Sequence, residues 1–192
     1  MKISWRGGST IELKSSGSVA VLNSQEKKED ITGLSTLVFD RTQKKLPELE
    51  EVVSVDWPGE YDVSEFAYKG VEIHGKESST IAYVFHFREG NVAWMGELAE
   101  YPDAKAIEAL GDVHVLILPV GGGDVLKAKD AFRLVEALEP VVVIPMCYGD
   151  ERDGLSAFIK EMDVKLPEEQ KSFDFKRSSL SGDTMELVLL KS

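Results

Sequence analysis

The 192-residue sequence has a single cysteine, Cys147, and only three histidines. One cysteine cannot form a disulfide within the chain, and this usage is typical of a protein in a reducing cytoplasm. We therefore expect a cytoplasmic protein. Three histidines are also few for a site that holds two metal ions, because imidazole is the commonest metal ligand.

Long apolar runs and an excess of positive charge are missing as well. No stretch reaches the roughly 20 consecutive apolar residues that span a membrane. The start of the chain, Met-Lys-Ile-Ser-Trp-Arg, carries charges where a signal peptide needs its apolar stretch, so no secretory leader is expected. The 34 acidic side chains against 22 Lys and Arg give a net charge of -12, which argues against nucleic acid and membrane surfaces as partners.

What the sequence does contain is enough apolar material for a packed core. Apolar residues make up 43% of the chain, which excludes a disordered acidic protein. The length is typical of one domain, and no linker-like stretch divides it. We therefore expect a single domain over residues 1–192.

Short apolar runs separated by turn residues fill the first half and predict strands. The runs are Ile11–Leu13, Val19–Leu22, Leu37–Phe39, Val52–Trp57, Ile81–Phe87 and Asn91–Met95. The first two and the last two are spaced as hairpins. Gly70 lies where the alternation changes phase, which predicts a β-bulge. The polar segment 24–32 is expected to be exposed.

The second half alternates between strand and helix patterns. Val113–Leu118 and Val141–Met146 are continuous apolar runs, typical of strands covered on both faces. Helices are expected over Pro102–Leu110, after a cap at Asp124, and around residues 155–162. A turn at 181–183 joins the last two short strands. This order predicts an α/β architecture of two mostly β layers with helices outside them.

Four blocks keep a common order between residues 50 and 150. They are Trp57–Ser64 with Pro-Gly-Glu-Tyr, Met95–Leu98 with Gly-Glu-Leu, Val115–Gly123, and Val143–Gly149 with Pro-Met-Cys-Tyr. In this order they resemble one branch of the metallo-β-lactamase-fold hydrolases, and Met1–Leu22 fits that family's first hairpin. The resemblance implies a four-layer αββα sandwich of the metallo-β-lactamase type, with any site at the mouth between the two sheets.

Enzymes of that family bind one or two metal ions, usually zinc, which activate a water for hydrolysis. Their main ligand motif, His-x-His-x-Asp-His, follows the strand that Leu37–Phe39 matches. Here residues 40–45 read Asp-Arg-Thr-Gln-Lys-Lys, which has no histidine and carries three cations that would oppose a metal. The family's bridging Asp is matched by Glu97 and its final His by Cys147, and the stretch between the sheets is shortened to residues 75–79.

The matched positions therefore offer at most Asp40, Glu97 and Cys147 as ligands, whereas a zinc site requires three or four protein ligands. We interpret these three positions as a vestigial site. The primary expectation is a pseudoenzyme without metal or cofactor, acting as a binding or assembly module for a small molecule or protein, and by resemblance a homo-oligomer. The alternative is a metal-dependent hydrolase of an ester, lactone or phosphodiester, with zinc in an altered site around Glu97 and Cys147. The residues leave open whether the chain is an enzyme.

Other polar residues give weaker indications. Glu60 and Tyr61 in the best-matched turn, and His74 near the expected sheet edge, are predicted to lie at the rim of the cavity. The other two histidines lie in strand-like runs and are interpreted as structural. The Gly121–Gly123 loop could present backbone N–H groups to an anion or nucleotide, but it lacks the spacing of a nucleotide-binding loop, so a structural turn is expected.

Overall fold

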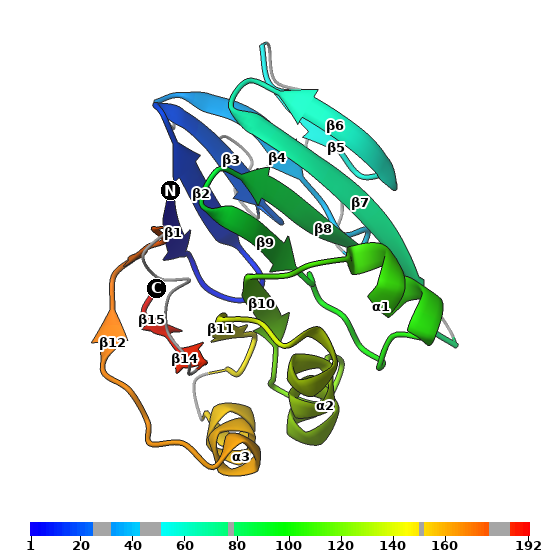
Figure 1. The fold of residues 1–192 in the computed structure, drawn as a ribbon, viewed down its shortest axis with the longest axis vertical. Coiled ribbons are helices and arrows are strands. Elements are labelled where there is room, and N and C mark those ends of the chain that lie inside the picture. Colours follow the sequence, from blue (N-terminus) through cyan, green and yellow to red (C-terminus); the bar gives the residue numbers. More distant parts are fainter. Residues whose placement is uncertain (25–31, 43–50, 77–78, 150–151, 177–184) are drawn as a thin grey trace.

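A computed structural model of the chain describes residues 1–24, 32–42, 51–76, 79–149, 152–176 and 185–192. Two mixed β-sheets lie face to face, and three helices pack against one of them (Figure 1). The predictions for segment 24–32, apart from its two end residues, and for the turn at 181–183 fall outside these described residues.

The first sheet has six strands in the order β13-β1-β2-β3-β4-β5. Their bounds are β1 (Lys2–Trp5), β2 (Ile11–Ser15), β3 (Ser18–Leu22), β4 (Leu34–Val38), β5 (Val53–Val55) and β13 (Phe173–Asp174). β1, β2 and β3 are antiparallel, which confirms the first predicted hairpin, whereas β3, β4 and β5 run parallel. Because of this parallel run, the chain leaves β3 and β4 at the same edge of the sheet.

The second sheet has seven strands in the order β14-β11-β10-β9-β8-β7-β6. Their bounds are β6 (Gly59–Val63), β7 (Phe66–His74), β8 (Ser79–Phe87), β9 (Gly90–Trp94), β10 (Val115–Pro119), β11 (Val142–Met146) and β14 (Glu186–Leu187). β6 to β9 form an antiparallel meander, which confirms the second hairpin, and β9, β10, β11 and β14 are parallel. A small parallel pair, β12 (Glu169–Gln170) and β15 (Leu189–Leu190), completes the described strands.

The bulge predicted at Gly70 is wrong, because β7 keeps one register against β8 from Ala67 to His74. Gly70 is instead a point of close packing. A Cβ there would lie 2.8 Å from the Tyr83 ring and 3.0 Å from the carbonyl oxygen of Trp57. The change of phase marks where the apolar residues of β7 pass from the core between the sheets (Phe66, Tyr68) to the cluster under the helices (Val71, Ile73).

The main core lies between the two sheets. It combines residues of the six-stranded sheet, such as Leu13 and Leu22, with large side chains of the seven-stranded sheet, such as Tyr68, Phe85 and Trp94. Side chains alternate between the faces of a strand, so the intervening residues point outward. On the outer face of the six-stranded sheet, Val19, Val21, Leu37 and Phe39 form a separate apolar cluster in which all four are fully buried.

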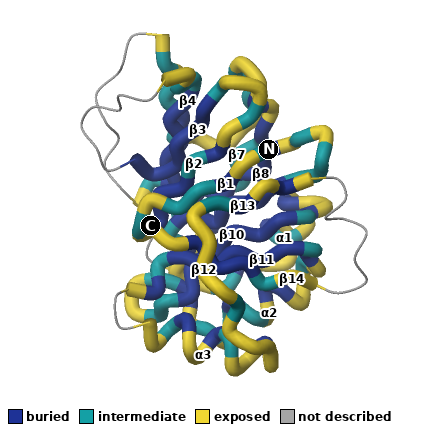
Figure 2. The backbone as a smooth tube through the Cα atoms, turned by 90° about the vertical axis from the view of Figure 1, so that its left-hand side faces the viewer, coloured by how far each residue is buried: buried dark blue, intermediate teal, exposed yellow. Residues whose placement is uncertain are grey.

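The helices α1 (Ala104–Leu110), α2 (Ala128–Leu138) and α3 (Asp153–Met162) cover the outer face of the seven-stranded sheet. Leu110, Leu134 and Phe158 of the helices share one apolar cluster with Leu116 and Val143 of the sheet. β10 and β11 are thus buried on both faces, as their continuous apolar runs predict. Figure 2 shows the dark buried strands with exposed residues on the helix surfaces. In the described part of the chain, no helix is long and apolar enough to cross a membrane.

The start of α2 differs from the prediction. The cap predicted at Asp124 is wrong, because α2 begins at Ala128 after Lys127. Residues 122–126 form a turn of their own, in which the Gly122 N–H donates to the carbonyl of Leu126. Leu126 in turn donates to the carbonyl of Leu98, so the chain is tied to the loop after β9 before the helix can start.

The N-terminus of α1 provides a test of this account. Asp103 accepts a hydrogen bond of 2.8 Å from the Ala106 N–H, so Asp103→Ala should lower the free energy of unfolding by about 1 kcal/mol. The matched change, Asp124→Ala, removes an exposed carboxylate that caps no helix and should stay within about 0.5 kcal/mol of the parent. Urea denaturation measures both, and equal losses in the two variants would contradict the helix boundaries.

Candidate functional site

The three matched residues each follow the carboxyl end of a strand. Asp40 comes two residues after β4, Glu97 three residues after β9, and Cys147 directly after β11. Carboxyl ends of parallel strands are where ligands bind in α/β sheets, because backbone and side chains leaving the strands converge there. The fold therefore brings residues from both sheets to one edge of the sandwich.

Asp40 is fully buried and its carboxylate is extensively hydrogen-bonded. Oδ1 accepts from the backbone N–H and the hydroxyl of Thr42, at 2.9 and 2.5 Å. Oδ2 accepts from the backbone N–H of Glu97 at 2.5 Å, which joins the end of β4 to the loop after β9. Burial raises the pKa of Asp40, and the hydrogen bonds from Thr42 and Glu97 oppose that rise.

This contact depends on Gly96. Its φ is +57°, and a Cβ at this position would lie 2.3 Å from Oδ2 of Asp40. Only glycine allows both the left-handed backbone and the close approach. Gly96 is therefore required locally, whatever chemistry the site performs.

Glu97 is half-buried and is held by a chain of buried polar side chains. Its Oε1 accepts from the Ser9 hydroxyl at 2.8 Å, and that hydroxyl accepts from Nδ2 of Asn23 at 3.1 Å. The Oδ1 of Asn23 accepts from the Asp40 N–H at 3.1 Å. Together with the Glu97–Asp40 hydrogen bond, these contacts close a ring of four residues, Ser9, Asn23, Asp40 and Glu97, which we call the buried ring.

Cys147 directly follows β11, at the same edge of the sandwich. Burial, followed by the charges of Glu97 and Asp40, raises the pKa of the Cys147 thiol to about 12. Its backbone has a φ of +55°, and its N–H donates to the carbonyl of Gly8 at 3.3 Å. The thiol therefore stays protonated at neutral pH.

These donors can be compared with what zinc requires. Carboxylates and a thiolate are zinc ligands, and three protein ligands are the number that a catalytic zinc needs. A carboxylate has about four acceptor positions, so three hydrogen bonds leave Asp40 room for one cation contact. Within the described ranges, however, no three His, Cys, Asp or Glu side chains are gathered around one point. Carboxylate and thiolate are donors that zinc accepts, but as they lie in the described part of the chain they do not form a site that could hold the ion.

Arg41 is one of the cations expected to oppose a metal, and the structure places its charge elsewhere. The guanidinium forms an ion pair with Glu72 at 2.9 Å and lies 4.3 Å from the centre of the Trp57 ring. Its Nε donates to the carbonyl of Asp56 at 3.0 Å. Because this charge is already paired, it opposes a cation at the site much less than the sequence suggested. The other two cations, Lys44 and Lys45, lie outside the described residues.

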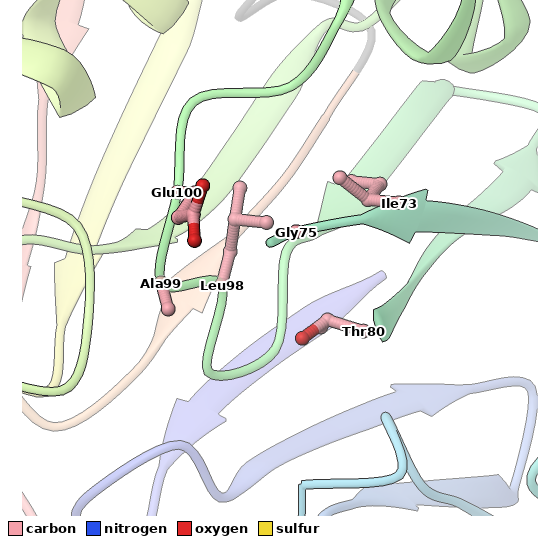
Figure 3. A pocket seen from close by; sticks show the side chains of 6 residues that line it. All are labelled: Ile73, Gly75, Thr80, Leu98, Ala99 and Glu100. Atoms are coloured by element: carbon pink, nitrogen blue, oxygen red, sulfur yellow. The ribbon is translucent and has the colours of Figure 1, made fainter. Parts of the chain in front are cut away.

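A small cavity adjoins the site between the sheet and the loop after β9 (Figure 3). Ile73, Gly75 and Thr80 line it from the β7–β8 end, and Leu98 and Ala99, with Glu100, line it from the loop. Its volume of about 20 Å³ is room for a single water molecule.

The structure separates the residues predicted at the cavity rim. Glu60 and Tyr61 line an open cavity of about 260 Å³ over β6, β7 and β8, together with Lys69 and His86. His74 is exposed at the end of β7 and lines neither of the two cavities described here. The assignment of these three residues to a functional rim stays a prediction.

The glycine loop is a close-packed turn. A Cβ on Gly121 would lie 1.9 Å from the carbonyl oxygen of Cys147, and the Gly122 N–H is used within the loop. The helix that follows starts only at Ala128. These contacts favour the structural turn over an anion site.

The sequence reasoning missed Ser9 and Asn23, which contact the matched residues directly. Both are fully buried polar residues. In the sequence each is a small polar residue next to an expected strand. Such residues are common in loops, so this position alone does not indicate a functional residue. Their partners lie 88 and 17 residues away in the sequence, so pattern alone could not pair them.

The comparisons with known proteins agree with this architecture. A family model described as "Beta-lactamase superfamily domain" matches residues 2–147. The chain is 38% identical over 69 residues to a UPF0173 metal-dependent hydrolase of Methanopyrus kandleri. This match covers 36% of this chain and 30% of that protein. A UPF0173 metal-dependent hydrolase of Aeropyrum pernix is 34% identical over 61 residues, 32% of this chain and 25% of the relative. The chain thus matches less than a third of the length of these relatives.

Two solved structures show the same fold over most of the chain. One is a proposed Zn-dependent hydrolase of the metallo-beta-lactamase superfamily from Thermotoga maritima, with a TM-score of 0.83 and 24% identity, covering 98% of this chain and 97% of that one. The other is an isothiocyanate hydrolase from Delia radicum gut bacteria, with a TM-score of 0.68 and 13% identity, covering 92% and 100%.

These findings overturn the primary functional expectation. The prediction of a pseudoenzyme that acts only as a binding or assembly module is wrong, because the relatives are named metal-dependent hydrolases. That expectation rested on the missing histidine motif, on Glu and Cys at two other matched positions, and on the cations within residues 40–45. The predicted sandwich architecture is confirmed. The chain therefore belongs to the beta-lactamase superfamily, and its two mixed sheets with their helices have the metallo-β-lactamase fold.

Proposed function

We propose that the chain is a metal-dependent hydrolase of an ester, lactone or phosphodiester, with an altered site in which carboxylates and a thiolate replace histidines. The proposal is supported by the positions of Asp40, Glu97 and Cys147, each of which follows the carboxyl end of a strand, and by the hydrogen bond that joins the Glu97 N–H to Asp40. The names of the sequence relatives support the same reaction class.

Asp40, Glu97 and Cys147 are the residues that would hold the metal ion. When bound, such an ion supplies Lewis acidity and lowers the pKa of a coordinated water, which makes hydrolysis possible near neutral pH. A bound cation would stabilise the ionised thiol of Cys147, whose pKa is raised by burial and then by the charges of Glu97 and Asp40.

The surrounding residues hold these donors in place. Thr42 and the Glu97 N–H orient the Asp40 carboxylate, and Ser9 orients the Glu97 carboxylate. The adjoining cavity has room for one water beside the loop that carries Glu97. Fixed donors matter for catalysis because displacements on the order of 1 Å can cost about 100-fold in rate.

Zinc titration of the full chain, combined with hydrolysis assays on a chromogenic ester, a lactone and a chromogenic phosphodiester, tests the proposal. We expect about one zinc ion per chain and zinc-dependent turnover of at least one substrate. Glu97→Gln and Cys147→Ser should each weaken zinc binding by about 100-fold or more, because even outer-shell partners are worth about 10–100-fold.

Glu108→Gln is the control for that experiment. Glu108 is an exposed carboxylate of α1 and is not one of the three donors. We expect its zinc affinity and turnover to stay within about twofold of the parent. Unchanged turnover in Glu97→Gln and Cys147→Ser would contradict the proposal.

The state of the thiol makes a separate prediction about pH. Since the pKa of Cys147 lies at about 12 instead of 9.0, the folded metal-free protein should react with iodoacetamide at pH 8 about 1,000-fold more slowly than an exposed thiol. By linkage, the stability that the protonated thiol contributes is fully present below pH 9 and is lost as the pH rises towards 12.

Mass spectrometry of alkylated samples measures this reactivity. The same protein unfolded in urea is the control, and it should react at the ordinary rate of a cysteine. Equal rates for the folded and unfolded protein would show that neither burial nor the two carboxylates act on the thiol.

A further inference from the structure

The open cavity of about 260 Å³ over β6, β7 and β8 lies apart from the strand ends that carry Asp40, Glu97 and Cys147. The Ile81 N–H at the start of β8 donates to the carbonyl of Asp40, whereas His86, five residues further along the strand, lines the cavity. At about 3.3 Å per residue, these two ends of β8 are roughly 17 Å apart. The cavity is therefore a separate place on the molecule.

The strand register explains why the sheet is hollow here. Tyr68 packs in the core between the sheets, so its neighbours Ala67 and Lys69 point to the outer face. Ala67 lies between Asp62 of β6 and His86 of β8 in the register. It is exposed, and its methyl group is much shorter than the side chains on either side. Ala67 is thus the floor of the cavity.

Two opposite charges line this cavity without forming an ion pair. Glu60 and Lys69 are directly opposite each other in the register, where opposite charges attract. Among the described residues, no salt bridge includes either of them. The Lys69 side chain extends instead towards the end of α1, where a Cβ on Gly111 would lie 3.6 Å from Nζ. Both charges are therefore available to a ligand.

His86 adds a hydrogen-bond acceptor whose identity is fixed by its neighbours. The carbonyl of Asp112 accepts from Nδ2 of Asn91 at 2.8 Å, so the Asn91 atom that faces Nδ1 of His86 at 3.0 Å is the oxygen, Oδ1. An amide oxygen only accepts, so Nδ1 of His86 carries the hydrogen. In a neutral imidazole Nε2 is then an acceptor, and it is the ring nitrogen left for a ligand.

We propose that this cavity binds a small zwitterion of the α-amino acid class. An ammonium group has three donors, which match the acceptors of Glu60 and His86, and a carboxylate matches the ammonium of Lys69. The charges of Glu60 and Lys69 cancel, so the cavity suits a ligand without net charge. Its volume is below the roughly 300–1,000 Å³ of pockets for drug-sized ligands, which fits a small molecule. The proposal shares no residue with the proposed hydrolytic site.

Titration of the full chain with L-leucine, followed by backbone amide chemical shifts in NMR, tests the proposal. Two analogues of the same shape each lack one charge, because isocaproate has no ammonium group and isoamylamine has no carboxylate. We expect L-leucine to shift the amides of Ala67, Lys69 and His86. It should bind at least about tenfold more tightly than either analogue, since each analogue loses a charge-assisted hydrogen bond. Equal affinities, or no shifts at these residues, would overturn the proposal.

Ala67→Leu tests the cavity itself. Because Ala67 is exposed, the fold has room for the larger side chain, which would fill the hollow beside His86. L-leucine binding should weaken by about tenfold or more, because the contact surface of the cavity is lost. Glu65→Gln changes an exposed charge in the turn between β6 and β7, outside the cavity, and should stay within about twofold of the parent. Parent-like binding by Ala67→Leu would refute the assignment.

Two charge variants identify which end of the ligand each residue binds. Lys69→Gln should weaken L-leucine binding about tenfold but should not weaken isoamylamine binding, because isoamylamine has no carboxylate. Glu60→Gln should weaken the binding of both, since both carry an ammonium group. A general loss of structure would weaken both ligands alike in either variant. Equal weakening of the two ligands in Lys69→Gln would therefore contradict the proposal.

Discussion

The structure of the site depends on one hydrogen bond, from the backbone N–H of Glu97 to the buried carboxylate of Asp40. It ties the end of a strand in one sheet to a loop that leaves the other sheet, at the mouth of the sandwich. A buried carboxylate is costly unless it is well hydrogen-bonded, so Asp40 is stable only with Thr42 and Glu97 in place. Glycine is needed at position 96 because a Cβ there would lie 2.3 Å from Oδ2 of Asp40.

The relative positions of Asp40 and Glu97 follow from this constraint. Burial, and after it the charges of Glu97 and Asp40, raise the pKa of the Cys147 thiol at the same edge of the sandwich. The guanidinium of Arg41 is directed away from this edge, to Glu72 and to the Trp57 ring. Glu97 and Cys147 stand where the resemblance places the family's bridging aspartate and final histidine, and the proposed metal dependence rests on these residues.

Much of the fold could be predicted from sequence, because individual strands and hairpins follow from local residue patterns. The continuous apolar runs of β10 and β11 and the two hairpins were predictable from residue spacing. Crowding at Gly70 and the start of α2 were not, because each depends on contacts with distant segments. At the site, Asp40, Glu97 and Cys147 were found by block resemblance, whereas Ser9 and Asn23 could not be, since side-chain hydrogen bonds leave no periodic trace.

The central claim is that a carboxylate–thiolate set at this edge binds zinc. X-ray absorption at the zinc edge of the full chain tests it most directly, because sulfur and oxygen ligands differ in distance. The account predicts one sulfur at about 2.3 Å together with oxygen ligands at about 2.0–2.2 Å. A ligand shell without sulfur, or the absence of tightly bound zinc, would contradict it.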